Sequence, residues 1–210
     1  MFLSLIVVYR NFSLVINHIL STINYSHITI SGGVCSGKGT LARNLKPHLQ
    51  PLGWTFFSGS EFAHTFAPHF YDEKIVSDKH HHTAQDYSDE TDRQIEDKMR
   101  VILQTKNHFV IEAWLAGYNA RGIDGVLKVL LMCSHPDVII DRIANRDNCT
   151  VEKAKEHLKA RETTNLTKWT RMYGDWGFLD PKNFDLVIDT YSSGPMETVG
   201  RVLDRLHIKK

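Results

Sequence analysis

The stretch Ile28–Leu45, ITISGGVCSGKGTLARNL, joins an apolar run, a glycine-rich turn and a helix start without a break. Its first four residues have the β-branched, alternating character of a short strand. After the turn, apolar residues recur at helical spacing at Leu41, Ala42 and Leu45. A strand, a glycine loop and a helix in this order are typical of a phosphate cradle, and the expected fold is built outward from it.

The loop itself has the spacing G-x-x-x-x-G-K, met by Gly32, Gly37 and Lys38. Glycines let consecutive N–H groups point at one anion, the following helix adds the positive end of its dipole, and the lysine ammonium reaches the outer phosphates. A glycine-rich turn with a chance lysine is the alternative, which the flanking strand and helix disfavour. The predicted donor-nucleotide residues are Gly32, Gly33, Ser36, Gly37, Lys38, Gly39 and Thr40.

The residue after the lysine distinguishes this loop from the commonest version. That position usually carries a hydroxyl that ligates magnesium, but here it is Gly39, and the hydroxyl follows at Thr40. The ending GKGT resembles that of adenylate kinases, and hence the loops of nucleoside monophosphate kinases. Magnesium should then be held by phosphate oxygens and water, so no protein metal ligand is predicted.

Composition limits the size of the domain and the class of partner. The 210 residues, 42% of them hydrophobic and 23% charged, suffice for one well-buried domain with a small appendage. A net charge of +1 provides no general field for polymeric nucleic acid, which is not an expected partner. Three cysteines without metal-ligand spacing indicate a reducing, cytoplasmic setting.

Two features invite more specific interpretations. Cys35, inside the loop, could be a thiolate activated by a helix N-terminus, although a plain small residue is the preferred interpretation. His80, His81 and His82 suggest a metal site, but adjacent residues do not share a helix face and no second ligand motif lies nearby. A solvated loop is therefore favoured for these histidines.

The segment Met1–Ser26 is apolar yet lacks the features of a signal peptide or a membrane span. Its apolar residues fall at helical spacing, so it could pack on the domain or on a membrane surface. We interpret it as an extension, or even an upstream translation start, on which function does not depend.

Downstream, short apolar runs alternate with helical patterns. Strands are predicted from about residues 28, 54, 108, 126 and 184, and helices over Thr91–Leu103, Pro136–Asn145, Thr150–Tyr173 and Met196–Ile208. The first helix should bend or end at Pro47, and a helix should start from Gly59 onward with Ser60 as its cap. The polar stretch Tyr71–Asp92 should be mobile or short-helical. This alternation predicts a parallel α/β sheet covered on both faces, with ligands beyond the carboxyl ends of its strands.

Seven stretches between Ile28 and Leu206 occur in a fixed order with short gaps: ITISG…SGKGT, FFSGSEFAHTFA, TDRQIED, FVIEAWLAGYNA, DRIANRD, ARETTNLTKWTRMYGDW and FDLVIDT. Together they resemble the cytidylate kinase family, in particular its short archaeal-type members. The resemblance implies a P-loop NTPase fold over 27–210, a five-stranded parallel sheet with a small acceptor (NMP-binding) insertion at about 58–105 and a helical lid at about 150–175.

The same resemblance implies an enzyme, a nucleoside monophosphate kinase. It would transfer the γ-phosphoryl group of ATP to CMP or dCMP with the help of Mg²⁺. Small-molecule nucleotides would be its partners, and a monomer is expected, with no firm prediction of membrane association.

Cations around the phosphates are the groups that phosphoryl transfer requires. Lys38 supplies the first, Arg142 and Arg146 lie one turn apart, and Arg161 and Lys168 lie two turns apart. The family has an arginine at each end of that two-turn spacing, so Lys168 keeps the charge but loses the bidentate fork. A solvated basic helix face is the alternative.

The acceptor side departs further from the family. In SGSEFAH, which begins at Ser58, the arginine expected to grip the acceptor phosphate is His64. In EAWLAG, which begins at Glu112, a second arginine has become Trp114. Two lost guanidinium contacts, each worth roughly 1.5 to 3 kcal/mol, would weaken acceptor binding.

Asp92 and Glu96, at i and i+4, mirror a paired-acid pattern of the family and could contact the base or an arginine, or be ordinary helix-surface charge. The departures leave two other hypotheses open: a kinase for a different nucleotide or small phosphorylated acceptor, and a nucleotide-binding protein with reduced catalysis. Retention of the loop and lid cations favours an active kinase.

Overall fold

The computed structural model describes residues 24–59 and 88–208, and their strands form one parallel sheet. The sheet order is β2-β3-β1-β4-β5, and every pairing between neighbours is parallel. The strands are β1 (His27–Gly32), β2 (Thr55–Ser58), β3 (Phe109–Glu112), β4 (Val126–Met132) and β5 (Leu186–Asp189). The predicted five-stranded parallel sheet is confirmed.

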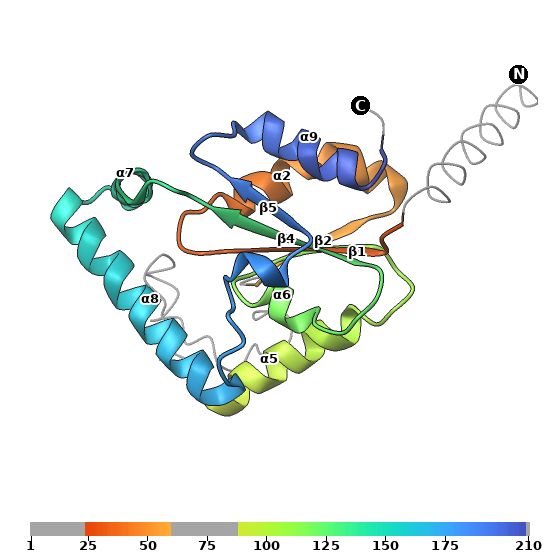
Figure 1. Ribbon diagram of the computed structural model, residues 1–210, viewed down its shortest axis with the longest axis horizontal. Coiled ribbons are helices and arrows are strands. Elements are labelled where there is room, and N and C mark those ends of the chain that lie inside the picture. The colour runs from red at the N-terminus through yellow and green to blue at the C-terminus, as the bar shows by residue number, and fades with distance from the viewer. Residues whose placement is uncertain (1–23, 60–87, 209–210) are drawn as a thin grey trace, which may run out of the picture.

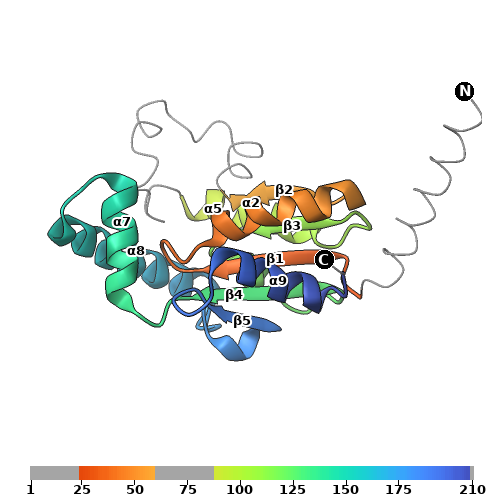
Figure 2. The ribbon, with the colours of Figure 1, turned by 90° about the horizontal axis from the view of Figure 1, so that it is seen from above.

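Helices cover both faces of this sheet, as Figure 1 shows. Helices α2 (Lys38–Leu49) and α9 (Pro195–Arg205) pack on one face, and α5 (Asp89–Ile102) and α6 (Ala116–Asn119) pack on the other. Helices α7 (Pro136–Asp147) and α8 (Val151–Tyr173) extend beyond the carboxyl ends of the strands (Figures 1 and 2). Single 3-10 turns occur at Gln50–Leu52 and Pro181–Asn183.

Side-chain alternation along β1 explains why both faces are covered. Ile28 and Ile30, both fully buried, point into the apolar layer formed with α2 and α9. Ser31 points to the opposite face, where its hydroxyl accepts a 2.8 Å hydrogen bond from the N–H of Gly117 in α6. Because the strand is buried on both sides, it is the rigid base from which the glycine loop projects.

Several local predictions are corrected by the structure. Helix α2 continues through Pro47 to Leu49, because a proline in the last turn removes only one intrahelical bond. Helix α5 begins at Asp89, inside the stretch predicted to be mobile or short-helical, because Ser88 caps it by accepting from the N–H of Thr91. The sequence also predicts that the hydroxyl of Thr150 caps α8 at Val151 and Glu152. It does cap the helix, but it accepts its hydrogen bond from the N–H of Lys153.

Other predictions lie outside the described residues: the helix in the N-terminal segment, the cap at Ser60, the histidines at 80–82 and the position of His64. Within residues 24–59 and 88–208, no helix has the length and apolar character needed to cross a membrane.

Candidate active site

The phosphate loop occupies the turn between β1 and α2, at the carboxyl edge of the sheet. Gly37, with φ of 98°, adopts a left-handed conformation directly before α2 begins at Lys38, and its carbonyl accepts the N–H of Leu41 at 2.9 Å. At Gly32, a Cβ would lie 2.6 Å from the carbonyl oxygen of Leu131, so only glycine fits there. The loop therefore carries no side chain at these two positions, and the N-terminus of α2 follows it directly.

Lys38 lies half-buried over this loop. Its Nζ donates to the carbonyl oxygens of Gly32 at 2.9 Å and Gly33 at 2.8 Å. Burial lowers the pKa of Lys38 to about 8, and the nearby guanidinium of Arg161 lowers it further, while Glu112 opposes the shift. Because its charged form is disfavoured by burial and by a neighbouring cation, this ammonium is stabilised more by a bound phosphate than a solvated lysine would be.

Two further residues of the loop, Ser36 and Cys35, differ in what they could contribute to ligand binding. The side chain of Ser36 is buried, and its hydroxyl has no hydrogen-bond partner among the described residues. Cys35 takes a left-handed backbone conformation, with φ of 51°, and burial raises the pKa of its thiol. This shift opposes activation of Cys35, so the interpretation as a small packing residue is the better one.

Arg142, on α7, connects the phosphate loop to the end of β5. Its guanidinium donates to the carbonyl oxygen of Cys35 at 3.2 Å, and to the hydroxyl and the carbonyl oxygen of Thr190 at 3.0 and 2.8 Å. Arg146, one turn further on, makes a bidentate pair with Asp147 at 2.6 and 2.8 Å, which raises its pKa. In this structure, therefore, both arginines already have protein acceptors.

The inner face of α8 is polar where it passes the loop and α5. Arg161 is half-buried and acts on the pKa of Lys38, which places it beside the phosphate loop. Lys168, only 7% exposed, instead pairs with Asp92 at 2.7 Å and Asp89 at 3.8 Å. The two cations of the predicted lid pair thus face different elements, the loop and α5.

The predicted acceptor acids also belong to this region. Ser58 and Glu112 are register partners at the ends of β2 and β3. Asp92 is 8% exposed, so the interpretation as exposed surface charge is wrong for it, and burial raises its pKa although Lys168 opposes the shift. Glu96 accepts a hydrogen bond from the amide of Asn119, and burial raises its pKa to about 7.

An aromatic cluster, which sequence analysis missed, joins α8 to the chain around α6. The indole of Trp114 meets that of Trp169 edge-on, with ring centroids 5.3 Å apart, and its Nε1 has no hydrogen-bond partner among the described residues. The guanidinium of Arg121 lies 3.7 Å from the ring centre of Tyr118. The other members are Leu115, Tyr173, Trp176 and Phe178. Their separation in sequence concealed the contact, although the density of aromatic residues from 169 to 178 is a usable signal.

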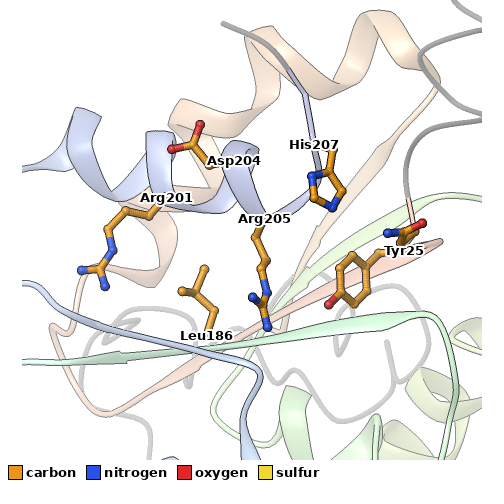
Figure 3. A pocket seen from close by; sticks show the side chains of 7 residues that line it. Tyr25, Leu186, Arg201, Asp204, Arg205 and His207 are labelled. Carbon is orange, nitrogen blue, oxygen red and sulfur yellow. The ribbon is translucent and has the colours of Figure 1, made fainter.

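A separate cavity of about 480 Å³ lies at the opposite edge of the sheet (Figure 3). Tyr25 and Leu186 line it where β1 and β5 begin, and α9 contributes Arg201, Asp204 and Arg205. Because the phosphate loop lies at the carboxyl ends of the strands, this cavity is not part of the candidate active site.

Comparison with known proteins gives a consistent result. The model of the cytidylate kinase-like family matches residues 27–192. A cytidylate kinase of Haloarcula marismortui is 31% identical over 163 residues, which cover 78% of this chain and 80% of the relative. A cytidylate kinase of Pyrococcus abyssi is 29% identical over 189 residues, covering 87% and 96%.

Solved structures agree on the fold. A gluconokinase of Sinorhizobium meliloti superposes with a TM-score of 0.56 at 14% identity, covering 87% of this chain and 91% of its own. A shikimate kinase of Aquifex aeolicus superposes with a TM-score of 0.50 at 14% identity, covering 86% and 96%. At this identity the likeness concerns the fold alone, an α/β kinase fold with a parallel sheet.

Proposed function

Because the chain belongs to the cytidylate kinase-like family, we propose that it transfers the γ-phosphoryl group of ATP to CMP or dCMP. In this reaction a phosphate oxygen of the acceptor bonds to the γ-phosphorus, the bond to the β–γ bridging oxygen breaks, and ADP leaves. Such a reaction needs alignment of the two phosphates, neutralisation of charge and exclusion of water more than it needs covalent chemistry.

The observation that carries the proposal is the placement of Lys38 and Arg161 around one loop. Lys38 projects from the start of α2 onto the loop carbonyls, and Arg161 approaches from α8 closely enough to act on its pKa. On binding ATP, the ammonium of Lys38 would exchange carbonyl oxygens for phosphate oxygens. Arg161 would then neutralise the charge that develops on the transferred group.

Magnesium fits this site as a companion of the nucleotide. Two oxygen donors near the loop are the carboxylate of Glu112, which is close enough to act on the pKa of Lys38, and the exposed hydroxyl of Thr40. Both are hard ligands, suited to Mg²⁺ directly or through its waters. The ion supplies charge neutralisation of the phosphates when bound.

For the acceptor, the proposal assigns the region where the ends of β2 and β3, α5 and the inner face of α8 come together. Ser58, Glu112 and the acids Asp92 and Glu96 are its polar groups, and Trp114 forms its aromatic side. We also assign His64, which follows Ser58 in the sequence, to the acceptor site. Free nucleotides are the proposed substrates, used by a monomer in the cytoplasm.

One observation favours a second candidate, a kinase with a different acceptor. Trp114 stands where the family has a phosphate-binding arginine, and its ring is occupied by packing against Trp169. The acceptor phosphate then depends on fewer guanidinium contacts, and a smaller or differently charged acceptor would suit the site.

A panel of monophosphates separates these candidates. The full chain is incubated with MgATP and CMP, dCMP, UMP, AMP, GMP or a small sugar phosphate, and ADP release is measured against a no-acceptor control. The proposal expects CMP or dCMP to give the highest kcat/KM. Preference for another acceptor would support the second candidate, and ATP binding without any turnover would support a nucleotide-binding protein.

A further inference from the structure

A carboxylate that the proposed reaction does not use lies against the phosphate loop. Glu162 follows Arg161 on α8, and its Oε1 is 3.6 Å from the position that a Cβ on Gly33 would take. The carbonyl of the same Gly33 accepts the ammonium of Lys38 at 2.8 Å. Gly33, inside the phosphate loop, is thus flanked by the ammonium of Lys38 and by the carboxylate of Glu162.

The carboxylate of Glu162 differs from the neighbouring acids in its partners among the described residues. Over the described residues, its carboxylate forms no hydrogen bond or ion pair, and burial alone raises its pKa. Two acids of α5 differ: Asp92 pairs with Lys168 at 2.7 Å, and Asp89 pairs with Arg171 at 2.7 Å. A half-buried, unpaired carboxylate therefore faces a loop built to hold anions.

Such an arrangement has different consequences for the two forms of a nucleoside triphosphate. Magnesium cancels about two of the negative charges of ATP, so a nearby carboxylate repels the metal complex much less than the free nucleotide. The loop has Gly39 in place of the usual metal-ligating hydroxyl, so a ligand at that position does not distinguish the two forms.

We propose that Glu162 is a specificity-determining residue that makes the phosphate loop select metal-complexed nucleoside triphosphates over metal-free ones. The inference rests on the proposed function, since it requires that the loop bind ATP. Glu162 acts by repulsion across the loop, and the neighbouring Arg161 keeps the net field attractive for the metal complex. The chain would thereby avoid occupation by a nucleotide that it cannot use as a donor.

The test compares ATP binding with and without magnesium in three variants. Glu162→Gln removes the charge at constant shape, Glu162→Asp keeps it, and Glu156→Gln changes an exposed acid on the outer side of the same helix. Calorimetry measures the Kd of ATP in excess Mg²⁺ and in excess EDTA, without acceptor, and thermal melts verify that each variant is folded.

Glu162→Gln is expected to tighten binding of metal-free ATP by about tenfold while changing the Kd of MgATP by less than about twofold. Glu162→Asp and Glu156→Gln should keep the wild-type ratio of the two constants. Equal tightening of both forms, or an unchanged ratio in Glu162→Gln, overturns the inference. If Glu162→Gln is unfolded, the test rests on Glu162→Asp. A folded Glu162→Asp variant that loses the wild-type ratio of the Kd for metal-free ATP to the Kd for MgATP also overturns the inference.

The two proposals fail in different ways. A wild-type protein that binds neither form of ATP refutes the proposed function itself. A protein that phosphorylates its acceptor, but whose preference for MgATP does not depend on Glu162, refutes only the present inference.

Discussion

Within the phosphate loop, Lys38 has two sets of possible partners. In the structure its ammonium donates to two loop carbonyls, and burial with neighbouring guanidinium groups lowers its pKa to about 8. Those carbonyl bonds are weak compared with a contact to a phosphate dianion. The residue is therefore held ready for a ligand and contributes little to the packing of the domain.

Lys38→Ala should accordingly reduce kcat by at least about a hundredfold, because the charge that develops on the transferred phosphoryl group loses its nearest cation. The melting temperature should change by only a few degrees. Steady-state kinetics and a thermal melt measure the two effects, with Arg43→Ala, an exposed cation on the same helix, as the control. Turnover near the wild-type rate would refute the assignment of the loop.

The half-buried side chain of Glu96 should make the free energy of unfolding depend on pH. Burial raises its pKa to about 7, so the folded protein holds a proton that the unfolded chain releases near pH 4.5. The stabilisation from that proton is complete below pH 4.5 and is lost as the pH rises through about 7. Wild type should therefore lose about 3 kcal/mol between pH 4.5 and 8 relative to Glu96→Gln.

Urea unfolding at several pH values measures this difference. Glu90→Gln, an exposed change on the same helix, should follow the wild-type curve. Parallel curves for wild type and Glu96→Gln would mean that Glu96 is ionised in the folded protein at neutral pH.

At the scale of elements, α8 is fastened to α5 by ion pairs that sequence analysis did not predict. The pattern of α8 indicated a helix with cations two turns apart, because helical periodicity and capping are local properties. It could not indicate that Lys168 would pair with Asp92, since that contact depends on how α5 and α8 meet in space. The same reason explains why the edge-on contact of Trp114 with Trp169 was missed.

The ion pairs between α5 and α8 predict that substitutions of Asp92 and Asp89 have unequal effects on stability. Asp92→Asn removes the closest described carboxylate from a buried ammonium, which should cost about 2 kcal/mol or more and lower the melting temperature by about 5 °C. Asp89→Asn should have a clearly smaller effect, because its pair with Arg171 is exposed to solvent. Thermal melts of both variants compare the two, and a larger loss for Asp89→Asn would contradict the packing of α8 on α5.

For the whole molecule, the fold could be predicted because its strands are short apolar runs separated by helical patterns, with the central strand β1 buried on both sides. The glycine loop then determined the edge at which a ligand binds. The acceptor side could not be derived in the same way, because His64 lies outside the described residues and Trp114 departs from the family pattern. The role of Trp114 depends on its neighbours in space, such as Trp169, and not on a sequence motif.

The N-terminal boundary can be tested at this scale. Ser26 donates its N–H to the carbonyl of Gly125 at 2.7 Å, and His27 is buried against Thr105 and Phe109. A chain that starts at Asn24 should therefore fold and keep full activity, since every predicted site residue lies downstream. A chain that starts at Ile28 should melt at a lower temperature, because it lacks both contacts. Lost activity in the longer truncated chain, measured beside the full chain, would show that the extension takes part in function.

The central claim, transfer of the γ-phosphoryl group to a cytidine monophosphate, is tested most directly by following that group. The full chain is mixed with MgATP labelled at the γ-phosphate and with CMP, and the labelled products are separated over time. We predict that the label appears in CDP in equal amounts with ADP, and that Lys38→Ala slows its appearance at least about a hundredfold at matched protein concentration. Label that remains in ATP, or that appears only as inorganic phosphate whether or not CMP is present, would contradict the account.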